Sequence, residues 1–237
     1  MSNTKLKNEL ISKFSSWFRD KIAKNHLTNT KKLKNLSEFD YNPFLLRYLP
    51  NFVFGECNPE NLAKSLLYPR ILGTSINTSF GQNSQSFFTE TLKELCGSMI
   101  SGIDIEFIDQ VDGRKKYCQL KTGPNNINKD DIETIKNHFK NARNIGRLNR
   151  ANISIGDLVV GVLYGTPERM NSFLTQLNQE YPVFIGKEFW HRLTGYENFY
   201  DELIDAFSKI ADEFNSEDVV KEVIKSLASD IKKAKLA

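Results

Sequence analysis

The sequence predicts an α/β fold: a small mixed β-sheet flanked by helices, with further helices at both ends of the chain. Two patterns carry this prediction. Alternating residues on either side of Asp112-Gly113 predict a β-hairpin. The continuous apolar run at 158–163 predicts a buried strand that runs parallel to a hairpin strand. Residues at helical spacing precede and follow both patterns, so helices are expected on both sides of the sheet.

The N-terminal part of the chain is expected to be mainly helical. Apolar residues at helical spacing predict an amphipathic helix over 4–25. The polar, lysine-rich residues that follow, up to Ser37, predict a loop. Asn42-Pro43 opens a short helix toward Tyr48.

A second helix and a long loop are expected before the hairpin. Asn58 is a predicted N-cap with Pro59 in the first helical position, and this helix should end before Tyr68-Pro69. The uncharged, mostly small residues of 74–84 predict a loop. Helical spacing returns at 85–96.

The hairpin places four polar side chains together. If its Asp-Gly pair is a two-residue turn, Asp104 lies opposite Lys121 and Glu106 lies opposite Gln119. Strand side chains alternate between faces, so these four share one face, with opposed Cβ atoms about 5 Å apart. Two carboxylates, an amide oxygen and an ammonium group so placed could hold one divalent cation and activate one water. This layout is typical of a metal-dependent phosphodiesterase.

Further elements are expected after the hairpin. Asn128 is the predicted cap of a helix with an acidic first turn, which suits the positive end of the helix dipole. One more short strand is predicted at 183–185. Helices are predicted at 168–178, 187–193, 198–213 and 216–235.

The amino-acid composition limits the classes of protein to which this chain can belong. The chain has 237 residues, 40% of them hydrophobic, which is enough for one well-packed domain. It has no apolar run of about 18 residues and no apolar signal-peptide core, so no membrane span is expected. Three scattered cysteines give no disulfide or zinc framework. These features indicate a soluble cytoplasmic protein. Three isolated histidines are interpreted as structural or exposed: His26, His138 and His191.

Charge is distributed unevenly along the chain. The formal net charge is only +3. Basic residues prevail from Arg114 to Arg150, whereas the C-terminal part from Glu197 is acidic in balance. A basic surface of this kind suits a polyanion. Solvated helix faces explain any single lysine equally well.

Two segments of the hairpin region resemble a known motif. They are Gly102-Ile-Asp-Ile and, after a gap, Tyr117-Cys-Gln-Leu-Lys-Thr-Gly-Pro124. Together they are similar to the PD-(D/E)XK nuclease signature. Ile103 stands where the motif has proline, and Gln119 stands where it usually has an acid. A neutral group therefore replaces an anionic metal ligand.

Four more segments extend the resemblance in the same order along the chain. They are Asn42-Pro-Phe44, Tyr68-Pro-Arg-Ile-Leu-Gly73, Asp157-Leu-Val-Val-Gly-Val-Leu-Tyr-Gly165 and Gly186-Lys-Glu-Phe-Trp190. They are similar to type II restriction endonucleases that cut GGNCC-centred palindromes of the RGGNCCY type. The resemblance implies a single endonuclease domain over 1–237. Within it, a helical, basic region would span 1–40, a nuclease core 41–195 and C-terminal helices 196–237.

The resemblance also implies an activity and partners. It implies a restriction-endonuclease-like core and Mg²⁺-dependent cleavage of double-stranded DNA that leaves 5′-phosphate ends. A palindromic site is matched by a two-fold protein, so a homodimer is expected. A cognate DNA methyltransferase would be its functional partner. Two alternatives stay open: a repair or recombination nuclease of the same fold, and a catalytically inactive DNA-binding module, which Gln119 keeps possible.

The resemblance assigns roles to the hairpin residues. Asp104 is the first expected ligand of Mg²⁺, which prefers oxygen donors. Gln119 and the backbone carbonyl of Leu120 would add further oxygens. Lys121 would orient the attacking water and stabilise the charged transition state. Each also has an ordinary interpretation, as a turn aspartate, a cross-strand glutamine or a surface lysine.

Additional carboxylates and DNA contacts complete the expected site. Glu106 could compensate for the missing acid at position 119. On the preceding helix, Glu90 is favoured over Glu94 as a catalytic carboxylate, although helical glutamates usually face solvent. Two sets of residues are expected to contact DNA, unless they serve only in turns and caps. They are Asn125, Asn126, Asn128 and Lys129 after the hairpin, and Thr74, Ser75, Asn77, Thr78 and Ser79 in the uncharged loop.

Overall fold

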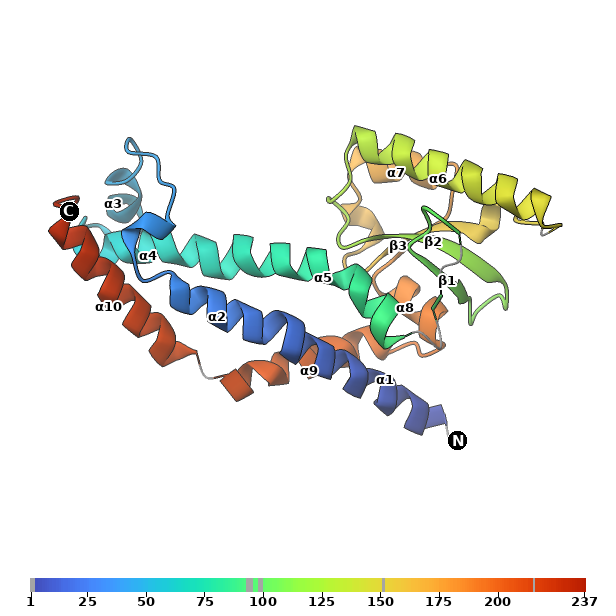
Figure 1. Cartoon of the computed structure of the whole chain (residues 1–237), viewed down its shortest axis with the longest axis horizontal. Coiled ribbons are helices and arrows are strands. Elements are labelled where there is room, and N and C mark those ends of the chain that lie inside the picture. The colour runs from blue at the N-terminus through green and yellow to red at the C-terminus, as the bar shows by residue number, and fades with distance from the viewer. Residues whose placement is uncertain (1–2, 93–95, 98–99, 151, 215) are drawn as a thin grey trace. The chain divides into compact units, whose positions relative to one another are not determined.

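The computed structural model of the chain (Figure 1) describes residues 3–92, 96–97, 100–150, 152–214 and 216–237. It divides into two compact units. The first, which we call the sheet unit, comprises Met1–Ser15 and Ser84–Phe207. The second, which we call the helical unit, comprises Ser16–Asn83 and Ser208–Ala237.

The sheet unit is built on four strands in the spatial order β1-β2-β3-β4. Strand β1 runs antiparallel to β2, whereas β2, β3 and β4 are parallel. Their bounds are Ile105–Ile108, Lys115–Lys121, Leu158–Val162 and Val183–Ile185. The predicted small mixed sheet is therefore confirmed, together with its buried central strand and the short fourth strand.

Helices cover both faces of this sheet. Helices α6 (Lys129–Leu148) and α7 (Ser172–Asn178) lie side by side over one face and share a core with β3 (Figure 1). Helix α8 (Lys187–Thr194) packs on the other face. Gly161 of β3 makes this close packing possible, because a Cβ atom there would lie 2.5 Å from the ring of Phe189.

Aromatic rings extend the core on the α8 side. They come from α1 (Asn3–Trp17), α5 (Ser75–Thr91), α8 and α9 (Phe199–Phe214). Their ring centroids lie 3.7 to 6.1 Å apart within contacting pairs. The rings belong to Phe14, Phe87, Phe88, Phe189, Trp190 and Phe199. Helices α1, α5 and α9 each contribute residues to both units.

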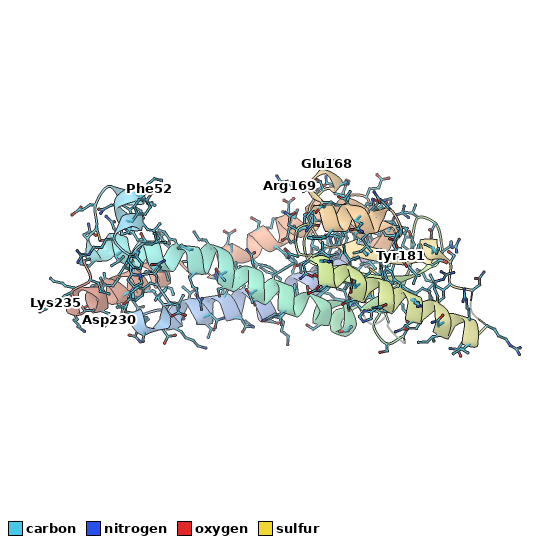
Figure 2. All side chains as sticks on the ribbon, turned by 90° about the horizontal axis from the view of Figure 1, so that it is seen from above. Phe52, Glu168, Arg169, Tyr181, Asp230 and Lys235 are labelled. Atoms are coloured by element: carbon cyan, nitrogen blue, oxygen red, sulfur yellow. The ribbon has the colours of Figure 1, made fainter. Side chains whose placement is uncertain are left out.

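The helical unit has its own core. Its helices are α2 (Lys24–Lys32), α3 (Tyr48–Phe54), α4 (Pro59–Pro69) and α10 (Glu217–Lys233), and α10 packs along α4. Asp230 of α10, labelled in Figure 2, accepts a hydrogen bond from Leu36 N–H at 2.9 Å. The buried apolar residues include Leu33, Leu46, Leu62, Leu67, Val223, Leu227 and Ile231.

Five short helical turns complete the list of elements. Two are π-helical, at Phe18–Ala23 and Arg70–Thr74. Three are 3₁₀ turns, at Leu36–Glu38, Ile155–Asp157 and Pro167–Arg169. The two π-helical turns matter for the chain path, because the first joins α1 to α2 and the second joins α4 to α5.

The N-terminal helix is longer than predicted. It passes through the π-helical turn at Phe18–Ala23 directly into α2, so the loop predicted from residue 25 is wrong as far as Lys32. Thr30 and Leu33 are buried at this end of the helix. Their burial within the helical unit stabilises a helix in a segment whose composition alone favours a loop.

Helix α4 begins as predicted but does not end as predicted. Asn58 caps it, since its side-chain oxygen accepts a hydrogen bond from Asn61 N–H at 2.9 Å. The helix includes Tyr68 and Pro69 and continues through the π-helical turn into α5. Proline supplies no N–H for the helical ladder, and a π-helical turn follows it directly.

The loop predicted at 74–84 is wrong, because Ser75–Ser84 is the first half of α5. Ile76 and Phe80 lie one helical turn apart and are half-buried. The Phe80 ring contacts Trp17, with centroids 6.0 Å apart. Tertiary packing therefore overrides the weak helix propensity of these small polar residues.

The hairpin register differs from the prediction by two residues. Ile105 pairs with Cys118, and Glu106 pairs with Tyr117 rather than Gln119. The predicted two-residue Asp-Gly turn is wrong, because the chain reverses over a wider loop closed by Asp109 N–H and Arg114 O at 2.9 Å. Continued by one step, this register places Asp104 opposite Gln119 instead of Lys121.

Asp109 explains the wider loop. Its buried carboxylate accepts hydrogen bonds from Val111 N–H at 2.9 Å and from Arg192 of α8 at 2.8 Å. Because side chains alternate with a period of two, a shift of two residues leaves every side chain on its predicted face. The four polar groups of the hairpin therefore keep one face, with different neighbours.

The division into units bears on the expected domain layout. Residues 41–83, assigned by resemblance to the nuclease core, lie in the helical unit. That the chain works as a single endonuclease domain stays a prediction. None of the helices in the described ranges is long and apolar enough to cross a membrane.

Candidate active site

The candidate site lies where the parallel strands end. Because β2, β3 and β4 are parallel, their carboxyl ends meet at one edge of the sheet, and Lys121 is the last residue of β2. The loops that follow these strands pack closely. A Cβ atom on Gly123 would lie 2.5 Å from the hydroxyl oxygen of Tyr164. The loops at this edge of the sheet are therefore closely packed against one another.

Asp104 and Leu120 meet at the open end of the hairpin. Strand β1 begins only at Ile105, so the backbone of Leu120 extends beyond its paired part. Its N–H donates to Oδ2 of Asp104 at 2.7 Å. The N–H and C=O of one strand residue point to the same side, so the Leu120 carbonyl is also directed to the Asp104 side of β2.

The environment of Asp104 disfavours its charged form. Burial raises the pKa of this carboxyl above its ordinary value. The hydrogen bond from Leu120 N–H and the nearby Lys121 and His138 act in the opposite direction without cancelling the effect of burial. A buried carboxyl group with a shifted pKa is a candidate functional group.

Lys121 is held by an acid that the sequence analysis did not single out as a site residue. Its Nζ lies 2.6 Å from Oδ1 of Asp131 in the first turn of α6. The other oxygen of Asp131 accepts Asn128 N–H at 2.9 Å as part of a capping box. The Asn-x-x-Asp spacing is a visible signal for the box, but nothing in it indicates the lysine partner.

Ionisation of Asp131 is favoured in this setting. Burial alone would raise its pKa. Hydrogen bonds from Lys121 and Asn128 N–H outweigh burial, so the pKa of this carboxyl lies below its ordinary value. The Asp131 carboxylate therefore holds the Lys121 side chain beside the end of β2.

Gln119 is buried, and both the nitrogen and the oxygen of its side-chain amide have polar partners. Its Nε2 donates to the carbonyl of Gly102, and its Oε1 lies 3.3 Å from Nδ1 of His138 on α6. Gly102 has φ +87°, and a Cβ atom there would lie 2.8 Å from the His138 ring. His138, interpreted from the sequence as structural or exposed, therefore supports both Gln119 and the backbone that leads to Asp104.

The other predicted carboxylates have different positions. Glu106 is buried and pairs with Lys115, whose Nζ lies 2.6 Å from Oε2. It also accepts Ile100 N–H at 3.2 Å, and its expected place opposite Gln119 is wrong. Glu90 belongs to α5, but its side chain lies outside the described residues, as does Glu94 altogether.

The loop after Lys121 presents asparagines to solvent. Asn125, Asn126, Asn128 and Lys129 are all exposed. Asn128 is the N-cap of α6, as predicted, and accepts Asp131 N–H at 2.9 Å. Asn126 donates to the hydroxyl of Thr122 at 2.7 Å. The loop joins Lys121 directly to the start of α6.

The second predicted DNA-contacting set lies in the helical unit. Of these residues, Thr74, Asn77 and Thr78 are exposed, while Ser75 and Ser79 are half-buried. Their spacing of three and four residues places the exposed side chains on one face of a continuous helix. They form an uncharged polar stripe rather than a loop.

The basic segment is partly neutralised inside the protein. Arg114 and Lys116 bind Asp157 and Asp112, and Lys136 pairs with Glu180. Lys129, Lys140, Arg147 and Arg150 are exposed. At about 100° per residue, the basic residues of α6 lie along one side of its buried face, and Asp131 and His138 lie along the other side. Lys129 is the first residue of α6 and directly follows the loop that carries Asn125, Asn126 and Asn128.

Comparison with known proteins decides the family. The family model described as type II restriction endonuclease EcoO109I matches residues 8–215. The chain belongs to this family. No curated protein matches the sequence. As a member of the EcoO109I family, the chain is a type II restriction endonuclease, a hydrolase that acts on double-stranded DNA.

The family assignment raises the question of a metal site at the sheet edge. Type II restriction endonucleases generally use a divalent metal ion. Among the described residues, no group of three His, Cys, Asp or Glu side chains gathers into a metal-binding cluster.

We expect Asp131→Asn to slow cleavage about 10- to 100-fold without weakening DNA binding. The amide oxygen can still accept Asn128 N–H, so the helix cap persists, but the charge that holds Lys121 is lost. The measurement is the single-turnover rate together with the binding constant in Ca²⁺. Asp130→Asn, one residue away and exposed, is the matched control. Equal rates for both variants would show that Asp131 does not position the lysine.

Proposed function

We propose that the chain is a Mg²⁺-dependent restriction endonuclease that cuts a GGNCC-type palindrome with the Asp104–Lys121 edge of its sheet. The meeting of Asp104 with the Leu120 backbone, directly before Lys121, is the observation that carries this proposal. The PD-(D/E)XK resemblance of these segments supports it. Glu90 stays a further predicted catalytic residue on α5.

The donors at this edge fit Mg²⁺. One carboxylate, a backbone carbonyl and an amide oxygen are hard oxygen donors, and Mg²⁺ keeps several waters and binds through one or two carboxylates and a phosphate. Asp104, Leu120 O and Gln119 Oε1 would hold the ion. Glu106, as a ligand, would first have to leave Lys115. A bound divalent cation would supply Lewis-acid stabilisation to the phosphate under attack.

The protein's own groups explain the rest of the reaction. The Lys121 ammonium donates hydrogen bonds that can orient the attacking water and stabilise negative charge on the phosphate oxygens. Asp131 holds this ammonium in place. Attack of water in line with the P–O3′ bond breaks that bond and leaves a 5′-phosphate and a 3′-hydroxyl.

The loop after Lys121 is the proposed recognition surface near the cut. Asn125, Asn126 and Asn128 offer amide groups, which suit base edges and phosphates. Lys129 follows them at the positive end of α6. In the helical unit, the stripe of Thr74, Asn77 and Thr78, flanked by Ser75 and Ser79, would contact DNA through hydroxyl and amide groups.

A plasmid digest tests this function. Discrete fragments with Mg²⁺ and none with EDTA are expected. Smearing, or cutting that depends on DNA structure rather than sequence, would favour a repair nuclease. Binding without cutting would favour an inactive DNA-binding module, the alternative that the neutral Gln119 suggests. A restriction enzyme in the cytoplasm also needs a cognate DNA methyltransferase that protects the host sequence.

Lys129→Ala should reduce the salt dependence of DNA binding. Each phosphate contact releases condensed counterions, so loss of one contact flattens the slope of log affinity against log salt by about one unit. Affinities are measured in Ca²⁺ at several salt concentrations. Lys225→Ala, an exposed lysine of α10, is the control and should leave the slope unchanged.

Two asparagine variants separate base reading from phosphate contact. Asn125→Ala and Asn126→Ala should keep the salt slope while narrowing the gap between cognate and non-cognate DNA by about 1–3 kcal/mol per lost base contact. If neither changes the specificity ratio, and Lys129→Ala leaves the slope intact, the loop is not part of the DNA surface.

A further inference from the structure

The loop after β3 is hydrogen-bonded to the loop after Lys121. Asn171 N–H donates to the carbonyl of Pro124 at 3.3 Å, and its side-chain nitrogen donates to the carbonyl of Ile127 at 2.9 Å. Gly165 lies so close to Pro124 that a Cβ atom on it would be 2.9 Å from the proline ring. The two loops therefore form one surface at the carboxyl edge of the sheet, and DNA bound at Lys121 would pass next to both.

A short, ordered turn in the loop after β3 presents two opposite charges. This 3₁₀ turn, Pro167–Arg169, is closed by Arg169 N–H, which donates to the carbonyl of Thr166 at 3.0 Å. Met170 follows it and packs against the core that β3 shares with α6 and α7. The side chains of Glu168 and Arg169 are exposed and lie next to each other on the outside of the turn (Figure 2).

A cleft of about 510 Å³ lies beside this turn, and Arg169 is one of the residues that line it. The charges of α8 in the same cleft are already paired. Lys187 Nζ lies 2.7 Å from the carboxylate of Asp201. Arg192 Nε lies 3.0 Å from the carboxylate of Glu188. In contrast, none of the residues that the structure describes forms an ion pair or a hydrogen bond with the Arg169 guanidinium.

Glu168 keeps its charge next to this guanidinium. A side-chain hydrogen bond from Thr166 lowers the pKa of the Glu168 carboxyl below its ordinary value. A carboxylate in this place repels the phosphates of DNA, which an arginine alone would attract. Base edges carry both hydrogen-bond donors and acceptors, so the two side chains together suit base edges better than the DNA backbone.

The proposed recognition site requires groups of this kind. The GGNCC centre of the palindrome has G·C pairs at all its fixed positions. Arginine can donate two hydrogen bonds to O6 and N7 of guanine, and glutamate can accept one from N4 of cytosine. The amides of Asn125 and Asn126 suit adenine instead. The asparagine loop therefore leaves the guanines without a matched donor.

We propose that the turn Pro167–Arg169 reads G·C pairs in the major groove. Arg169 donates to O6 and N7 of a guanine, and Glu168 accepts from N4 of a cytosine in the same half-site. This inference rests on the proposed function, because it names the base pairs that the same edge of the sheet recognises. In the homodimer that a palindromic site implies, each copy of the turn reads one half of the palindrome.

Duplexes with single modified bases test the turn. 7-Deazaguanine lacks the N7 acceptor, so at the guanine that Arg169 reads it should weaken binding of the wild type in Ca²⁺ about 5-fold or more. Arg169→Ala should bind the unmodified duplex about 5- to 100-fold more weakly and should no longer respond to the modified base. Arg147→Ala, which changes another exposed arginine of the sheet unit, is the matched control and should respond as the wild type does.

Glu168→Ala gives a second readout, with opposite signs on two DNAs. Affinity for the recognised duplex should fall about 5-fold or more, because N4 of the cytosine loses its acceptor. Affinity for unrelated DNA should rise at least about 2-fold, because the repulsion between the carboxylate and the phosphates disappears. A variant that was merely less well folded would lose affinity for both DNAs.

Three results would overturn the inference. Arg169→Ala could respond to 7-deazaguanine as strongly as the wild type does. It could instead weaken binding equally on recognised and unrelated DNA and flatten the salt slope by about one unit, which would assign Arg169 to a phosphate. Unchanged binding by Arg169→Ala would make this arginine an ordinary surface residue.

The inference and the proposed function can fail separately. The duplex sequence is taken from the ends of fragments that the wild type produces or, without cutting, by selection of bound duplexes. If that sequence contains guanine but not GGNCC, or is bound and not cut, the proposed function fails in that respect and the turn is tested on the sequence found. If the wild type cuts at GGNCC and Arg169→Ala keeps its response to 7-deazaguanine, only the turn fails. Both fail if the wild type prefers no sequence or one without G·C pairs.

Discussion

Asp104→Asn is expected to abolish DNA cleavage while the protein stays folded. The substitution keeps the shape of the side chain and an oxygen that can accept Leu120 N–H, but it removes the Asp104 carboxylate from the proposed cation site. Lys121→Met should have an effect of similar size, on the order of 10²- to 10⁴-fold in single-turnover rate, the range for loss of a positioned catalytic group. Binding of cognate DNA in Ca²⁺ should survive Lys121→Met.

The same Asp104→Asn variant should be more stable than the wild type at pH 7 without metal. Burial raises the pKa of Asp104 in the folded state. The stability that a raised pKa contributes is present below the unfolded-state value near 3.8 and is lost as pH rises through the folded-state value. At neutral pH the buried charge therefore costs stability, which asparagine avoids.

Urea unfolding at pH 7 and at pH 4 checks this prediction. The gain in unfolding free energy should be present at pH 7 and shrink toward pH 4, where the aspartate is increasingly protonated in both states. Adding Mg²⁺ should stabilise the wild type but not the variant, because only the wild type retains the carboxylate ligand. A variant that cuts DNA at nearly the wild-type rate, or is stabilised by Mg²⁺ equally, would contradict the role given to Asp104.

Gly102→Ala is expected to lower cleavage at least about 100-fold by moving the residues around Asp104. Gly102 has φ +87°, which costs a non-glycine residue about 1–3 kcal/mol. The added methyl group would also lie 2.8 Å from the His138 ring. Because the Gly102 carbonyl also binds Gln119, both neighbours of the site would shift.

Gly113→Ala is the matched control. Gly113 also has a positive φ of +71°, but a Cβ atom there meets nothing within 4 Å. Both variants should lose stability in thermal unfolding, whereas only Gly102→Ala should lose cleavage beyond what its lower stability explains. A comparable loss of cleavage in both would mean that the effect is one of general stability.

The elements of the sheet could be predicted because their signals are local. Alternation around the hairpin and the apolar run of β3 reflect which face of each residue is buried. The register could not be predicted, because the loop is anchored by a bond between Asp109 and Arg192, 83 positions away in sequence. The four polar side chains of the hairpin still share one face despite this error, since a shift of two residues preserves faces.

The interactions around the candidate site could not be predicted from the sequence for a similar reason. Asp131 carries a local signal as a capping residue, but its bond to Lys121 depends on how α6 crosses the end of β2. His138 reaches Gln119 only in the folded protein. At Ser75–Ser84, local propensity predicted a loop. Tertiary contacts such as the one between Phe80 and Trp17 stabilise a helix there instead.

Sequencing the ends of DNA fragments produced by the enzyme with Mg²⁺ tests the central claim most directly. We expect every end to carry a 5′-phosphate and to reconstruct one palindromic sequence with a GGNCC centre, and we expect Lys121→Met to produce no such ends. Ends without a common sequence, ends that carry a 3′-phosphate, or unchanged cutting by Lys121→Met would contradict a site-specific endonuclease acting through the Asp104–Lys121 edge.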